Sequence, residues 1–226
     1  MPAPNIIQLR QLLAERFPGL RTRAEELTAL PRLVWSSGLP QLDGPLRGGL
    51  PRGVLTEVVA ERRGAGSALL MTALIQRAME ENKLVAVVDG QDSLDVTQIR
   101  GDLSRLLWVR CRAAAEAMKA ADLLLRDANV PLVLLDLACN PAAQLRKIPA
   151  TTWYRFQRIV EMASTVCVVL APRPMVSPAQ ARIVLNSRFS LDALERDADD
   201  LLGELRMEVS EARRAGEMLE AVSGSA

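Results

Sequence analysis

From about residue 54 the chain alternates short apolar runs with longer stretches of helical spacing. The runs at 84–89, 131–136 and 165–170 are almost unbroken in apolar residues, which is typical of strands buried on both faces of a sheet. The pattern predicts strands at 54–59, 84–89, 107–110, 131–136 and 165–170, helices at 66–82, 93–105, 113–128 and 149–163, and strand-like pieces at 181–185 and 188–191. This order predicts an α/β fold with a mostly parallel central sheet and helices on both faces.

Both ends of the chain have a different pattern. Residues 5–17 carry apolar side chains at helical spacing before Pro18-Gly19, so an N-terminal helix is expected. It packs on its own core or, as the family resemblance given below implies, mediates self-association. Apolar residues recur every seven positions from Leu191 to Leu219 and predict an amphipathic helical tail. Three parts follow: an N-terminal helix and linker at 1–35, a core at 36–190 and an acidic tail at 191–226.

The tail has three possible roles. It folds back on the core, it remains partly disordered, or it binds a partner through an apolar face formed by Leu194, Leu201, Leu205 and Leu219. Residues 192–226 contain ten acidic residues and four arginines, which leaves the rest of the chain mildly basic. This separation of charge suggests separate tasks, and deletion of 192–226 is expected to leave the core folded.

Composition removes several kinds of chemistry. The 226 residues include no histidine, so imidazole bases and histidine-ligated metals are excluded. The three cysteines, Cys111, Cys139 and Cys167, form no C-x-x-C pair and are expected to be buried thiols in a reducing compartment. Without a signal peptide or a long apolar span in the sequence, a cytoplasmic protein without membrane contact is expected.

The segment between the first predicted core strand and its helix lies where a phosphate-binding loop, G-x-x-x-x-G-K-[ST], would occur. Here that pattern reads Ala60, Ala65, Gly66, Ser67. Alanine replaces both framework glycines and Gly66 replaces the lysine, so the ammonium that would neutralise a bound phosphate is missing.

The flanking residues resemble the ATPase core of RecA over residues 36–190. Ser37–Asp43 and Gly48–Glu57 resemble its start, and Leu84–Asp95 resembles its next strand, with Gln91 at the catalytic glutamate position. Val130–Asp136 is similar to the Walker B strand and keeps its aspartate, whereas the strand at 165–170 ends in Ala171-Pro172 instead of the nucleotide-sensing Asn-Gln. An amide at Gln91 cannot act as a general base, so ATP hydrolysis is not expected.

The resemblance implies a vestigial nucleotide site made of Ala60, Arg62, Arg63, Gly64, Gly66, Ser67, Gln91 and Asp136. Ser67 and Asp136 could still hold Mg²⁺ with a triphosphate, and Arg62 or Arg63 could replace the ammonium. The expected outcome is nevertheless no cofactor, no metal and no catalytic residue. Asp136 is then retained because it ends a strand or accepts a polar contact.

Cations follow the Walker B-like strand, roughly where the resemblance implies a DNA-binding loop. Candidates for weak DNA contact are Arg146, Lys147, Arg155 and Arg158, interleaved with Trp153, Tyr154 and Phe156, and Arg173 in the loop after the strand at 165–170. At least one of these aromatic residues must face the core, and the short loop at 173–178 excludes RecA-style strand exchange.

Among RecA-like proteins, the segment from Trp153 to Pro174 is most similar to ImuA, a family of accessory factors of mutagenic repair. The resemblance implies a non-catalytic adaptor in DNA-damage tolerance (translesion synthesis in the SOS response). Its partners would be an ImuB-like Y-family polymerase homologue, RecA and an error-prone replicative-type polymerase. Two alternatives are a RecA paralogue with residual ATP and DNA binding, and a division inhibitor similar to SulA.

Overall fold

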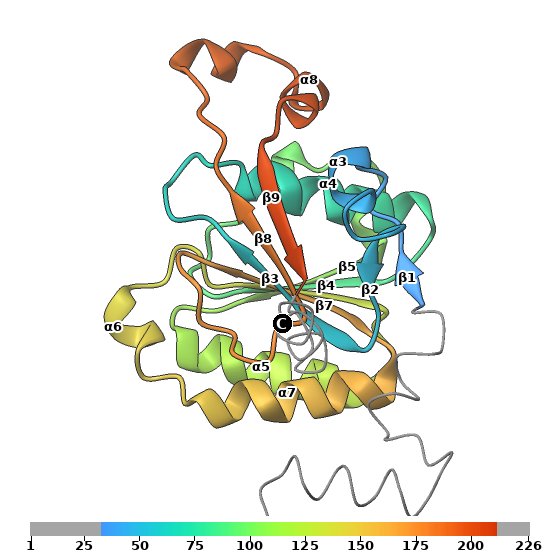
Figure 1. Cartoon of the computed structure of the whole chain (residues 1–226), viewed down its shortest axis with the longest axis vertical. Coiled ribbons are helices and arrows are strands. Elements are labelled where there is room, and N and C mark those ends of the chain that lie inside the picture. The colour runs from blue at the N-terminus through green and yellow to red at the C-terminus, as the bar shows by residue number, and fades with distance from the viewer. Residues whose placement is uncertain (1–32, 212–226) are drawn as a thin grey trace, which may run out of the picture. The chain divides into compact units, whose positions relative to one another are not determined.

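The computed structural model describes residues 33–211, so the helix expected at 5–17 and the distal tail with Leu219 lie outside the described residues. Its centre is a seven-stranded sheet with the order β5-β4-β6-β7-β3-β8-β9 (Figure 1). The strands are β3 (Val54–Val59), β4 (Val85–Asp89), β5 (Leu106–Arg110), β6 (Leu132–Asp136), β7 (Val166–Ala171), β8 (Ala181–Leu185) and β9 (Met207–Glu211). Every neighbouring pair is parallel except β8 and β9, which confirms the predicted α/β class.

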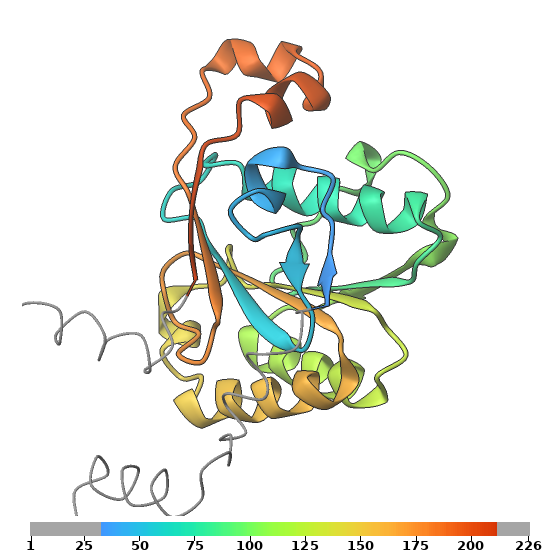
Figure 2. The ribbon, with the colours of Figure 1, turned by 45° about the vertical axis from the view of Figure 1, so that its right-hand side comes forward.

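Helices cover both faces of this sheet, as Figures 1 and 2 show. Helix α4 (Ser67–Glu80) lies on one face, and α5 (Ala114–Asp127), α6 (Ala142–Leu145) and α7 (Ala150–Ala163) lie on the other. Successive strand residues alternate between the two cores: Val85 and Val87 pack with α4, whereas Ala86 and Val88 pack with α5. Because both faces are covered, the strands read as continuous apolar runs.

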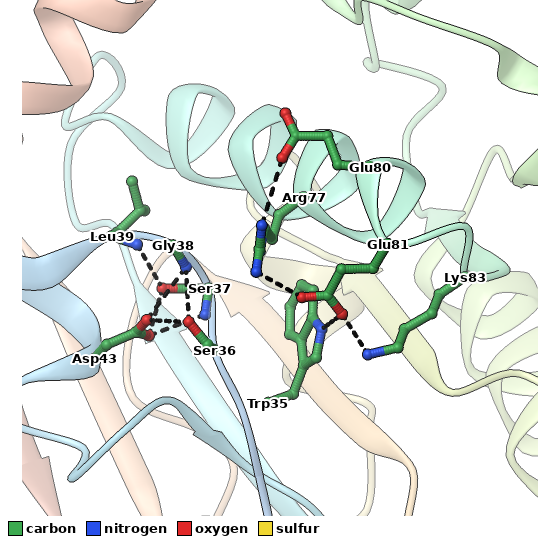
Figure 3. A network of polar contacts seen from close by, with 10 residues as sticks. All are labelled: Trp35, Ser36, Ser37, Gly38, Leu39, Asp43, Arg77, Glu80, Glu81 and Lys83. Atoms are coloured by element: carbon green, nitrogen blue, oxygen red, sulfur yellow. Dashed lines mark hydrogen bonds and ion pairs between the residues drawn. The ribbon is translucent and has the colours of Figure 1, made fainter.

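The segment before the core forms a small antiparallel ribbon of β1 (Val34–Trp35) and β2 (Leu50–Pro51), joined through α3 (Pro40–Asp43). Figure 3 shows how it is held. Asp43 accepts hydrogen bonds from the Oγ of Ser36 at 2.7 Å and from the backbone and hydroxyl of Ser37, while Trp35 donates its indole N–H to Glu81 at 2.8 Å. Asp43 therefore holds the connection of the ribbon, and Trp35 anchors the ribbon to the end of α4.

Two predicted elements of the core are wrong. The helix expected at 93–105 is replaced by two 3₁₀ turns, Val96–Gln98 and Leu103–Arg105. Asp95 and Asp102 accept the backbone N–H groups of Thr97 and Ser104, which holds each segment in a short turn and competes with a continuous helix. The strand-like piece at 188–191 lies in an irregular connection after β8.

The tail is also different from the prediction over its described part. Residues 191–211 form a 3₁₀ turn (Leu191–Glu195), a short helix α8 (Ala198–Gly203) and strand β9, and not one amphipathic helix. The seven-residue spacing concealed a second pattern, because Met207 and Val209 alternate with Glu208 and Ser210 as a strand requires. β9 forms an edge of the core sheet, so the core extends beyond the expected boundary at 190.

The cysteines divide into two groups. Cys111 and Cys167 are buried as expected, and burial raises the pKa of the Cys167 thiol to about 12. Cys139 is exposed, which corrects the prediction that it is buried, because it lies in the turn beyond β6 and not within the strand. Within residues 33–211, no helix is long and apolar enough to cross a membrane.

Candidate functional site: a closed phosphate loop

The carboxyl ends of the central strands place most of the vestigial site along one edge of the sheet. Asp89 of β4 is paired with Asp136 of β6, which in turn is paired with Leu170 of β7. The backbone N–H of Ala60, directly after β3, donates to Ala171 at 3.0 Å. Since ligands of open α/β sheets bind beyond these ends, the structure brings the loop, Gln91 and Asp136 to the edge where a ligand site is expected.

The loop itself has an apolar interior and a charged exterior. Ala60 and Ala65 are buried members of the core on the α4 face, whereas Arg62, Arg63 and Gly64 are exposed. Gly66 precedes α4 with a φ of 103°, in the left-handed region, and no side chain caps the helix. The two alanines that replace framework glycines are therefore packing residues, and the first turn of α4 keeps its unpaired backbone N–H groups.

Leu205 lies directly on Gly66. A Cβ built on Gly66 would be 2.2 Å from Cδ1 of Leu205 and 3.7 Å from Cε2 of Phe189. Leu205 is 4% exposed and belongs to the same core as Ala60 and Ala65. A leucine methyl group therefore occupies the space into which the side chain at the lysine position would extend.

Burial of Leu201 and Leu205 corrects the expectation that these leucines are presented to a partner. Leu205 packs against the core on the α4 face because the chain returns to the sheet as β9, and Leu201 is 9% exposed. The side chain of Leu194 and the whole of Leu219 are outside the described structure, so their partner role stays a prediction.

Asp136 is buried at the carboxyl end of β6. It is 7% exposed, and its Oδ1 accepts the backbone N–H of Ala138 at 2.9 Å. Burial, with a further contribution from the charge of Asp89, raises the pKa of Asp136 to about 6. Among the residues described, no group of three or more acidic or cysteine side chains is placed to hold a metal ion.

Gln91 is bound to the chain segment beyond β6. Its Oε1 accepts a hydrogen bond from Nδ2 of Asn140 at 3.3 Å, and Nδ2 of Asn140 also donates to the carbonyl of Gly90 at 2.7 Å. Gln144 continues the chain of contacts by accepting both from Asn140 and from the N–H of Ala114 at 2.9 Å. The amide at the position of the catalytic glutamate thus links the β4 end to the start of α5.

Sequence reasoning missed two buried polar anchors. Glu57, with no exposed surface, accepts from the N–H groups of Met175 and Val176 at 2.6 and 2.8 Å and from Arg182. Gln157 of α7 accepts the N–H of Leu55 at 3.0 Å and donates to the carbonyl of Gly53. The signal for Glu57 was present, because a lone carboxylate inside an apolar strand requires partners.

The DNA-contact candidates are all exposed: Arg146, Lys147, Arg155, Arg158 and Arg173. Arg155 forms an ion pair with Asp122 at 3.0 Å. Trp153 and Phe156 are buried against each other at right angles, with ring centroids 6.0 Å apart, so two of the three aromatic residues face the core. Only Tyr154 of the three remains exposed for stacking.

This geometry, a mostly parallel sheet with a phosphate loop at the carboxyl edge, defines a RecA-like α/β core. No known protein family profile matches the chain. It is similar to the RecA protein of Chlorobium chlorochromatii, with 26% identity over 60% of this chain and 43% of the relative. RecA of Synechococcus elongatus is 30% identical over 49% of this chain and 32% of its own length. RecA of Methylococcus capsulatus is 31% identical over 43% of this chain and 29% of its own length.

The chain thus spans less than half the length of these curated relatives. The similarity supports a RecA-like core. The residues present do not fit a bound triphosphate in this conformation, because Leu205 covers Gly66 and the loop interior is apolar. Within the loop, Arg62 and Arg63 carry the positive charge that a phosphate would need.

Proposed function

We propose that this protein is a non-catalytic RecA-like adaptor in DNA-damage tolerance, similar in role to ImuA. The observation that carries the proposal is the contact of Leu205 with Gly66, where a working phosphate loop has a lysine and open space. Asp136 bonded to its own backbone turn and Gln91 bonded to Asn140 add support. A RecA-shaped subunit without a nucleotide switch is suited to constitutive binding.

The partners under this proposal are an ImuB-like Y-family polymerase homologue, RecA and an error-prone replicative-type polymerase. The decisive experiment is a pull-down of the purified full chain with each partner, performed with Mg-ATP, with Mg²⁺ alone and with a chelator. Equal retention under all three conditions is expected. Retention that requires Mg-ATP, or no retention of any of the three partners, would overturn the adaptor proposal.

The distal tail provides a sharper version of this test. Because β9 belongs to the sheet, a deletion from 192 would remove core structure, so the truncation belongs after residue 211. We expect a chain of residues 1–211 to keep the melting temperature of the full chain but to lose polymerase binding, because Leu219 is removed. Unchanged binding by the folded truncated chain would exclude the tail as the contact.

A RecA paralogue with residual DNA binding is the second candidate. It is favoured by the exposure of Arg146, Lys147 and Arg158, for which the described structure records no ion pair. Replacing these three residues by glutamate should abolish any retention on single-stranded DNA, and binding should fall steeply with salt. Replacement of Arg47, Arg105 and Lys119 by glutamate is the matched control, because it makes the same change of charge at exposed residues outside the candidate set. Equal loss in both variants would indicate a general charge effect.

A further inference from the structure

The connection between β8 and β9, residues 186–206, is called the strap below. Its ends lie together, since the backbone N–H of Asn186 donates to Arg206 at 3.1 Å and that of Arg206 donates to Oγ of Ser187 at 2.8 Å. Between these ends the strap carries α8, which projects beyond α3 and α4 at one end of the molecule in both ribbon views (Figures 1 and 2) and contacts α4. These two hydrogen bonds hold the ends of the strap together at its base. Movement of the strap as a unit would therefore require its contacts with the loop to break.

The contacts between strap and core are of two kinds. The apolar contact is Leu205 on Gly66, with Phe189 and Leu202 packed against the same core. The polar contacts are few and peripheral: Gln41 donates to the carbonyl of Leu202 at 2.8 Å, Arg62 to that of Ser187 at 3.4 Å, and Arg100 pairs with Asp199 at 3.0 Å. The apolar contact is thus central, and the polar contacts surround it.

The surfaces of the loop and the strap are complementary in shape, and several residues contribute to this fit. Ala60 and Ala65 supply methyl groups where a phosphate loop has glycines, and Gly66 lacks the side chain that would collide with Leu205. The strap also carries six carboxylates and three arginines, and two of its carboxylates are ion-paired, Asp199 with Arg100 and Glu204 with Arg196. An incoming polyphosphate would therefore meet an occupied space at Gly66.

We propose that the strap is a built-in plug of the phosphate loop, with Leu205 as the residue that closes it. The plug takes the place of a ligand and holds residues 60–67 in one conformation at all nucleotide concentrations. This inference concerns the chain alone. It rests on the same contact of Leu205 with Gly66 as the proposed function, but the hydrogen-exchange test below does not depend on any partner, so failure of the plug and failure of the partner pull-down are separate results.

Amide hydrogen exchange of the full chain tests the plug directly. Leu205→Ala should accelerate exchange in residues 63–70 at least about tenfold, because the loop loses its cover, while β4, β6 and β7 keep their protection. Leu145→Ala is the matched control, since Leu145 is 2% exposed but belongs to the core on the other face. Its exchange at 63–70 should remain that of the parent chain.

A second variant keeps the test decisive if Leu205→Ala fails to fold. Gln41→Ala with Arg100→Ala removes two polar contacts without touching the core, and should raise exchange at 63–70 by a smaller factor of about three. Unchanged exchange at 63–70 in every folded strap variant would overturn the proposal. An increase in the Leu145→Ala control equal to that in the strap variants would also overturn it, since the effect would then be global.

Discussion

Glu57 and Arg182 are register partners on the neighbouring strands β3 and β8, and the guanidinium Nε lies 2.7 Å from a carboxylate with no exposed surface. The other oxygen of Glu57 accepts two backbone N–H groups from the segment after β7. The carboxylate of Glu57 therefore links β3, β8 and the loop that follows β7. Glu57 therefore has three hydrogen-bond donors, two from the backbone and one from Arg182, although it lies inside an apolar strand.

Removal of Arg182 should be costly, because it leaves the Glu57 charge buried without its cation. We expect Arg182→Ala to lower the free energy of unfolding by about 3 kcal/mol. Arg155→Ala breaks an ion pair that is half exposed and should cost less than about 1 kcal/mol. Urea unfolding of both variants decides the matter. Equal costs would mean that the Glu57 pair contributes no more than a surface pair.

Gly90 should tolerate no side chain. A Cβ at this position would lie 2.2 Å from Oδ1 of Asn140 and 2.7 Å from the carbonyl oxygen of Asp136. Gly90→Ala is expected to destabilise the protein by about 3 kcal/mol and to disturb the Gln91–Asn140 contact. Gly203→Ala, where a Cβ meets nothing within 4 Å, should be neutral or stabilising by about 0.5 kcal/mol. Thermal denaturation of the two variants gives the comparison, and similar melting temperatures would contradict it.

Burial raises the pKa of Asp136 to about 6, so the contribution of this group to the free energy of unfolding should depend on pH. Between pH 4 and 6 the folded state binds more protons than the unfolded state, so this group lowers stability as the pH rises and costs up to about 3 kcal/mol above pH 6. Asp136→Asn should therefore stabilise the protein at pH 7.5 and lose most of that advantage at pH 4.5. The amide oxygen can still accept from Ala138.

Urea unfolding of parent and variant at the two pH values measures this difference. Asp127→Asn, at the exposed end of α5, provides the control and should show no comparable pH-dependent gain. A gain of equal size at both pH values for Asp136→Asn would mean that packing, and not ionisation, sets the cost at this position.

Restoring the lysine should not restore ATP hydrolysis. Gly66→Lys places a Cβ 2.2 Å from Leu205, and Ala60, Ala65 and Gln91 remain. We expect no ATPase activity and a loss of stability. Gly64→Lys separates backbone strain from the collision with Leu205, because Gly64 also has a positive φ but a Cβ there meets nothing within 4 Å. The difference between the variants should be about 1–3 kcal/mol. Measurable turnover by Gly66→Lys would place the enzyme alternative first.

The parallel core was predictable because its strands are buried on both faces and its helices are amphipathic, so each element carries its own signal. The chemical departures at Ala60, Ala65, Gly66 and Gln91 were equally visible. What could not be predicted was the partner of Gly66. Leu205 is 139 residues further along the chain. It belongs both to the seven-residue apolar repeat that predicts a helix and to the two-residue alternation that predicts the strand after it. Only tertiary pairing with β8 decides between them.

The antiparallel pairing of β9 with β8 also has a consequence for biosynthesis. All strands that form the functional edge, from β3 to β7, precede residue 172, whereas the leucine on Gly66 and the strand that anchors it lie after residue 204. Since chains are synthesised from the amino terminus, the strands β3 to β7 are all made before the segment that covers the loop. A nascent molecule therefore passes through a stage in which the apolar loop is bare, and chaperones would encounter it there.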